Sequence, residues 1–241
     1  LDGSTAWLAG GEPDLKSVDI SDPRSPSLVS GINLPGGEWG LDAADGRVFV
    51  AAGPTGLLVI DGSDPGEPEL LSILDLDSVA NDVSATDSGV LVAWGRNGLT
   101  AIDVSIPIDP TVVASWTNPF PRVDAVDVVM DGDNLVVADH SYQDGRLRVL
   151  DTGNPRRPVE LSYAPLPADA VAVAVEAGLA MVVHATLWVE LVVDGFIGTW
   201  AKMSDGKDGR PTPGIKPIGK ARDHWHSLQD QRGEIVSIEE R

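Results

Sequence analysis

Short apolar runs, rather than long amphipathic ones, fill most of the chain. Within residues 79–117 the runs VANDVSAT, SGVLVAWG, GLTAIDV and PTVVASW are rich in β-branched residues, and turn residues such as Asn97-Gly98 separate them. Runs of this length between Gly, Asn, Asp and Pro clusters are typical of β-strands, whereas a helix would repeat apolar side chains every 3.6 positions. The pattern predicts an all-β fold with units of four antiparallel strands.

A phrase of one aspartate and two prolines sets the period of these units. Asp19, Asp61, Asp103 and Asp151 are each followed by proline four and seven positions later, and successive aspartates are 42, 42 and 48 residues apart. Proline cannot donate to a sheet ladder, so these prolines end the third strand and shape the crossing to the fourth. Four strands in about 42 residues is the size of a β-propeller blade. We expect about five blades within residues 1–202: 5–34 (without its innermost strand), 38–75, 79–117, 123–164 and 169–202.

Residues 57–95, LLVIDGSDPGEPELLSILDLDSVANDVSATDSGVLVAWG, resemble the LVIVD repeat family. Its unit is a hydrophobic strand ending in Asp, a Ser-Asp-Pro turn and an Asn-Asp-Val strand, and the resemblance extends over about residues 5–194. Some copies depart from it, as where Gly62 replaces a branched residue. The resemblance implies a propeller with the ANDV strand innermost, from a bacterial or archaeal surface or secreted protein, and it implies no common activity or catalytic residues. Extracellular or cell-surface localisation is therefore expected.

The last part of the chain does not follow the repeat. Residues 203–241 contain Pro211, Pro213 and Pro217 and few apolar residues, which predicts mostly loop. A β-like run at 234–238 is a candidate strand that would close the ring beside residues 4–10. The alternatives are an unrelated tail on a broken propeller and a fragment of a larger propeller, because the chain looks as if it begins internally.

Composition narrows the classes of partner. The formal net charge is −20, which disfavours nucleic acid because its phosphates must be neutralised by Lys and Arg. The chain has no cysteine, so disulfides and thiolate metal sites are excluded. The apolar stretch 170–193 is interrupted by Glu176, Gly178, His184 and Glu190, which indicates successive buried strands and no membrane span.

One face of the propeller is expected to vary more than the other. Loops between strands two and three of a blade, and loops between blades, emerge together on what we call the variable face. The spacing is 21 residues from Asp61 to Asp82 and from Asp82 to Asp103, but 24 from Asp103 to Asp127 and from Asp127 to Asp151. Both expansions fall in variable-face loops, and variable loops on a rigid scaffold are where binding usually resides.

Aromatic and basic side chains are expected on the same face. They suit a recognition surface, although each aromatic could instead pack only against its own loop. The predicted binding residues are Trp39, Trp94, Phe120, Arg122, His140, Tyr142 and His184.

Aspartates on the innermost strands form a second candidate site. Asp42, Asp82 and Asp127 are predicted to occupy equivalent positions at the mouth of the central channel, where the fifth blade has Ala172. Such carboxylates could bind Ca²⁺, which prefers several oxygen ligands. The simpler interpretation is that each accepts hydrogen bonds from neighbouring loop amides and links one blade to the next.

No convincing catalytic set and no convincing set of metal ligands is evident, and no cofactor is expected beyond the weak case for Ca²⁺. The sequence favours a non-enzymatic scaffold that binds a protein or a glycan. One alternative is a hydrolase-like enzyme with the three aspartates and His184 at the channel mouth. The other is a purely structural surface protein.

Overall fold

The computed structural model describes residues 3–37, 40–86, 89–117, 123–140, 145–154, 156–166, 169–176, 179–184, 188–193 and 196–202. Every helix or strand in this part of the chain is a β-strand, which confirms the all-β prediction. No helix that could span a membrane is found among these residues. The tail 203–241, with the expected closing strand at 234–238, lies outside them.

The strands form antiparallel sheets in chain order, which we call blades. The first blade has three strands: β1 (Thr5–Ala9), β2 (Leu15–Asp19) and β3 (Ser27–Ile32). The second has β4 (Gly40–Ala44), β5 (Arg47–Ala51), β6 (Leu57–Asp61) and β7 (Glu69–Leu74). The third has β8 (Asp82–Thr86), β9 (Gly89–Ala93), β10 (Leu99–Asp103) and β11 (Thr111–Trp116). The fourth has β12 (Ala125–Asp131), β13 (Asn134–Asp139), β14 (Arg146–Asp151) and β15 (Val159–Pro165). The fifth has β16 (Ala170–Glu176), β17 (Leu179–His184), β18 (Trp188–Val193) and β19 (Phe196–Lys202).

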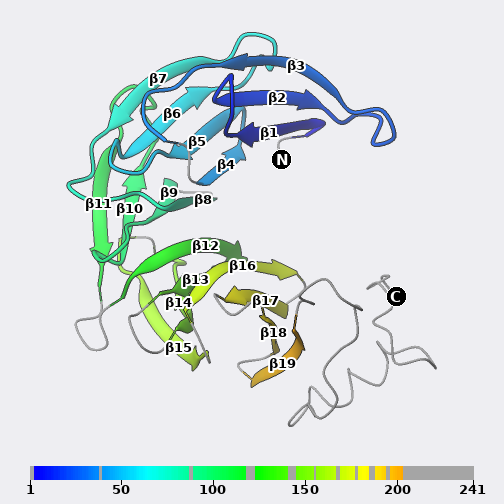
Figure 1. Ribbon diagram of the computed structural model, residues 1–241. Helices are drawn as coiled ribbons and strands as arrows, with labels where there is room; N and C mark the ends of the chain where they lie inside the picture. The colour runs from blue at the N-terminus through cyan, green and yellow to red at the C-terminus, as the bar shows by residue number, and fades with distance from the viewer. Residues whose placement is uncertain are drawn as a thin grey trace.

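The blades stand side by side in an arc, as in a β-propeller. Their innermost strands pack in succession, β4 on β8, β8 on β12 and β12 on β16, while β1 packs on β4. Figure 1 shows the strands β3, β7, β11 and β15 at the periphery of this arc. The repeat unit predicted from the sequence is therefore a four-stranded propeller blade.

The recurring aspartate makes a turn, as the sequence indicates. Asp61 Oδ1 accepts hydrogen bonds from Ser63 N at 3.0 Å and Ser63 Oγ at 2.6 Å, and Asp19 Oδ1 accepts one from Ser21 N at 2.8 Å. These bonds from the serines hold the pKa of Asp61 and of Asp19 below the usual value. The aspartate thus begins the crossing to the outermost strand and stays ionised.

Each outermost strand carries one extra residue near its middle. In the second blade Val59 pairs with Ser72 and Ile60 pairs with Leu70, which leaves Leu71 as a β-bulge. The same interruption occurs in the pairings of β3, β11, β15 and β19. A bulge increases the local twist and can re-aim a side chain, and in the fourth blade the bulge residue is Leu161.

The hydrophobic core lies between neighbouring blades rather than in one central mass. Between the second and third blades Phe49 and Val59 pack with Val83, Val92 and Ile102, all of them buried. Equivalent clusters join the other neighbouring blades. Because each of these described clusters joins two neighbouring blades, a substitution in one blade acts on the interfaces that adjoin it.

Candidate functional site

Several residues of the predicted binding face lie outside the described part of the chain: Trp39, Phe120, Arg122 and Tyr142. His184 ends β17, and its side chain is likewise outside the description. The structure therefore places only Trp94 and His140 of this set in full, and for the other five the prediction stays a prediction.

Trp94 and His140 both lie in loops between the second and third strands of a blade, and both contact a neighbouring segment. Trp94 Nε1 donates to Leu76 O at 3.1 Å, and its ring is partly buried against the core between the second and third blades. His140 Nε2 lies 3.2 Å from Asp169 Oδ2, in the linker to the fifth blade. The Trp94 indole thus fixes its own loop, as the alternative interpretation holds, while His140 keeps 42 % of its side chain exposed.

The three innermost-strand aspartates each accept a hydrogen bond from the next blade. Asp42 Oδ2 accepts from Ala85 N at 2.9 Å, Asp82 Oδ2 from Val128 N at 2.9 Å and Asp127 Oδ2 from Val173 N at 2.6 Å. These bonds favour the simpler interpretation, in which the carboxylates link blades. Within the described residues no group of three or more His, Cys, Asp or Glu is placed to hold a metal ion.

The predicted equivalence of these aspartates is wrong for Asp42. Asp82 pairs with Ala93, as Asp127 pairs with Ala138, but in the second blade Gly40 occupies this position and Asp42 lies two residues further along the strand. A two-residue shift keeps side chains on the same face, so alternation in the sequence cannot detect it. Gly40 is glycine for a steric reason, because a Cβ there would lie only 1.9 Å from Asp82 Oδ1.

The electrostatics of Asp82 differ from those of an ordinary aspartate. Burial raises the pKa of Asp82 to about 8, and the neighbouring Asp127 carboxylate adds to the rise. Asp82 is therefore protonated at neutral pH, on an innermost strand next to that of Asp127. Val128 N donates to Oδ2 of this partly buried group, Gly40 lies close to Oδ1, and the Asp127 side chain is a further hydrogen-bond partner.

An open groove of about 560 Å³ lies at the periphery, between the outermost strands of the third and fourth blades. Its lining comes from β11, from the residue after it and from β15: Trp116, Thr117, Glu160, Leu161, Ser162 and Tyr163. Tyr163 and Leu161 are 54 % and 57 % exposed. Leu161 is the bulge residue of β15, since Val149 pairs with Ser162 and Leu150 with Glu160.

The groove reaches the variable-face end of the blades. Trp116 pairs with Leu99, the first residue of β10, and Tyr163 pairs with Arg148, close to the start of β14. Both β10 and β14 begin after variable-face loops, so the two aromatic residues lie toward that face. Thr117 directly precedes the expanded segment 118–122 of the sequence.

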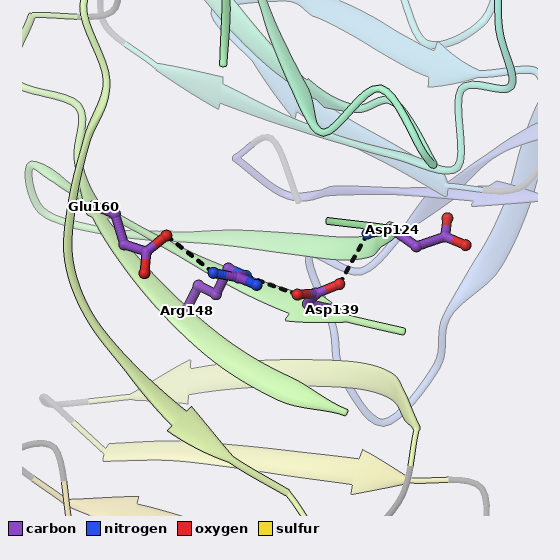
Figure 2. Close-up of polar contacts among 4 residues, drawn as sticks. All are labelled: Asp124, Asp139, Arg148 and Glu160. Atoms are coloured by element: carbon purple, nitrogen blue, oxygen red, sulfur yellow. Dashed lines mark hydrogen bonds and ion pairs between the residues drawn. The ribbon is translucent and has the colours of Figure 1, made fainter. Parts of the chain in front are cut away.

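Behind the groove lies an ionic triad, which is formed by one residue from each of three adjacent strands: Asp139, Arg148 and Glu160. Arg148 Nε on β14 is 2.7 Å from Asp139 Oδ2 on β13, and Arg148 Nη1 is 3.0 Å from Glu160 Oε2 on β15. Asp139 Oδ1 accepts a further hydrogen bond from Asp124 N at 2.8 Å, and Figure 2 shows these contacts. Arg148 and Asp139 are fully buried, whereas Glu160 keeps 19 % of its side chain exposed at the groove.

This triad replaces an apolar set found in the second blade. By strand register the residues equivalent to Asp139, Arg148 and Glu160 are Ala52, Leu58 and Leu70. The sequence pattern does not single out Arg148, because it stands in the apolar run RLRVLD and its partners are on two other strands. The signal in the sequence that could have found Arg148 is its charge at a repeat position where the second blade has the buried Leu58.

Two arginines also stand over the groove's tyrosine. The guanidinium carbon of Arg146 is 4.8 Å from the centroid of the Tyr163 ring, and that of Arg148 is 5.9 Å from it. Stacking of this kind stabilises the ring orientation by a cation–π interaction. Arg146 is the first residue of β14, after the expanded loop of the fourth blade, so the residues around the groove adjoin both sequence expansions.

Comparison with known proteins shows repeats and fold but no activity. Residues 3–33, 41–75 and 79–118 match the family model described as LVIVD repeat. A comparison with curated proteins found no match. A functionally unknown protein from Desulfotomaculum acetoxidans DSM 771 has a similar structure with a TM-score of 0.63 at 12 % identity, over 82 % of this chain and 65 % of that one.

Two computationally designed proteins are also similar in structure. For Ika8 the TM-score is 0.58 at 12 % identity, over 81 % of this chain and 57 % of that chain. For Ika4 it is 0.51 at 13 % identity, over 70 % and 92 %. The chain thus spans less than two thirds of the length of Ika8 and of the Desulfotomaculum protein, and identities this low show the fold alone. Over residues 3–33, 41–75 and 79–118 the chain thus carries LVIVD repeats, and its four-stranded sheets form a β-propeller-like fold.

Proposed function

We propose that the protein is a non-enzymatic binding scaffold, exported or displayed at the cell surface, whose ligand site lies at the junction of the third and fourth blades. The observation that carries this proposal is the groove of Trp116 and Tyr163, with walls from two blades. Residues at the groove directly precede or closely follow both expansions in the sequence. Concave sites with aromatic walls and a few polar groups are the usual form of a ligand site.

The fourth blade also departs from the repeat in its interior. A buried ion pair is weak evidence for stability, because apolar side chains of similar volume do as well or better. The second blade has such apolar side chains at these positions, so a blade of this fold does not require an ionic triad. What Arg148 adds is a fixed orientation for Glu160, which lines the groove.

The enzyme alternative rests on one observation, the raised pKa of Asp82 beside Asp127. Pairs of neighbouring carboxyl groups are used by some enzymes for acid–base catalysis. A catalytic carboxyl must reach its substrate, however, and the Asp82 carboxyl is engaged by Val128 N and Asp127 and lies against Gly40. The geometry therefore favours a structural role for Asp82 and a binding role for the groove.

The test compares the wild-type protein with Tyr163→Ala on arrays of immobilised peptides and glycans. Ile73→Ala is the matched control, because Ile73 occupies the position equivalent to Tyr163 on β7 and is 46 % exposed. The proposal expects spots that the wild type and the control share and that Tyr163→Ala loses. Equal binding by all three proteins, or no binding by the wild type, would overturn it.

A further inference from the structure

We propose that the groove between β11 and β15 is a carbohydrate site that takes a neutral oligosaccharide. This inference rests on the proposed function and names its ligand class.

The charges around the groove disfavour an ionic ligand of either sign. A cation stacked on the open side of Tyr163 would lie near the guanidinium groups of Arg146 and Arg148, which already occupy that ring. An anion would meet the carboxylate of Glu160 in the lining, and the charge of Arg148 is already compensated by Asp139 and Glu160. Like charges at such short range repel each other, and partial burial strengthens the repulsion. A neutral ligand avoids both penalties.

The exposed rings supply flat apolar surface. Tyr163 is 54 % exposed and Trp116, on the facing strand, is partly buried. Rings held in fixed positions offer apolar contact at low entropic cost, and the C–H face of a pyranose ring is a flat apolar surface of matching size. Leu161, re-aimed by the bulge of β15, extends the same surface.

Polar groups for sugar hydroxyls lie among these apolar side chains. Arg148 Nη1 holds Glu160 Oε2 at 3.0 Å, so the Glu160 carboxylate is oriented before a ligand arrives. A carboxylate accepts strong hydrogen bonds from hydroxyl groups, and orienting it in advance reduces the ordering cost of binding. Thr117 and Ser162 add hydroxyl groups that both donate and accept.

The size of the groove fits this class of ligand. Its volume of about 560 Å³ lies within the range of roughly 300–1,000 Å³ that is typical of small-molecule sites. The groove is open, as binding to an internal part of a longer chain of sugars requires.

The experiment is isothermal titration of the purified protein with cellohexaose, xylohexaose, maltohexaose and hexa-N-acetylchitohexaose, with polygalacturonate as the anionic probe. We expect the wild type to bind at least one neutral hexaose. Tyr163→Ala should weaken that binding at least tenfold, since a central aromatic contact carries a large share of affinity. Tyr163→Phe keeps the ring and should stay within about threefold of the wild type, as should the control Ile73→Ala. Far-UV circular dichroism confirms the folding of each variant.

The outcomes separate this inference from the proposed function. If no neutral hexaose binds, or if polygalacturonate binds better than every neutral hexaose, the inference is wrong. It is also wrong if Tyr163→Ala binds the hexaose as well as the wild type does. If the arrays instead give a peptide ligand that Tyr163→Ala loses, the proposed function stands and the carbohydrate inference fails.

Discussion

The ionic triad of the fourth blade allows a quantitative prediction about stability. The perturbation is Arg148→Leu, which introduces the residue found at the equivalent position, Leu58, of the second blade. It leaves Asp139 fully buried without its cationic partner, although Asp124 N still donates to it at 2.8 Å. Glu160 loses its partner too, but it can reach water at the groove.

The expected magnitude follows from this burial. Removing one partner of a buried ion pair typically costs roughly 3–5 kcal/mol, because the remaining charge is left without compensation. Here only Asp139 is fully buried, and it keeps a backbone hydrogen bond, so we expect about 3 kcal/mol. The triple variant with Asp139→Ala, Arg148→Leu and Glu160→Leu restores the apolar set of the second blade and should lie within about 1 kcal/mol of the wild type.

The assay is guanidinium chloride unfolding at pH 7, followed by tryptophan fluorescence and far-UV circular dichroism. Free energies of unfolding for the wild type, Arg148→Leu and the triple variant come from linear extrapolation. The reasoning is refuted if Arg148→Leu is as stable as the wild type. It is equally refuted if the triple variant is no more stable than the single one, since the loss would then not come from the uncompensated charge.

Substitutions at three other positions test the remaining parts of the structure. The pKa of Asp82 is about 8 in the folded protein and about 4 when unfolded, so the stability that its protonated form contributes is complete below about pH 4 and is lost as pH rises toward 8, by at most about 1.4 kcal/mol per pH unit. In urea unfolding at pH 5 and pH 8, Asp82→Asn should therefore gain stability relative to the wild type as pH rises. A difference that stays constant with pH would refute the raised pKa. Trp94→Phe should lower the free energy of unfolding by about 1 kcal/mol through the lost hydrogen bond to Leu76 O, and Trp94→Ala should lower it by roughly 2–3 kcal/mol because packing is lost as well. Both values come from guanidinium chloride unfolding midpoints. If Trp94→Ala is as stable as the wild type, the indole does not anchor its loop. Gly40→Ala should lower the stability by roughly 1–3 kcal/mol, because the new methyl group displaces the Asp82 carboxyl group. In thermal melts, Gly40→Ala should cost less stability in an Asp82→Ala background than in the wild type. Stability losses that simply add in the double variant would contradict the contact.

The strands and turns of the fold follow from local chemistry in the sequence. Asp61 with its Ser63 and two prolines specifies the crossing between strands three and four wherever the phrase recurs. The β-branched runs between turn residues specify strands without reference to the rest of the chain. These local signals suffice for the blade and for the propeller-like architecture.

The candidate site depends on contacts that no local pattern contains. The groove needs Trp116 and Tyr163, which are neither adjacent in the chain nor in the same blade, to face one cavity. Arg148 reads as an interruption of an apolar run until Asp139 and Glu160 are seen on the strands beside it. The placing of Asp42 fails for a related reason, because strand pairing, rather than composition, fixes its register.

The most direct test of the account is a crystal structure of the protein grown with the neutral hexaose that binds most tightly. The account predicts sugar density in the groove, with one ring against Tyr163 and a hydroxyl within hydrogen-bond distance of Glu160. Density at the innermost strands beside Asp82, or on the opposite face of the propeller, would contradict it.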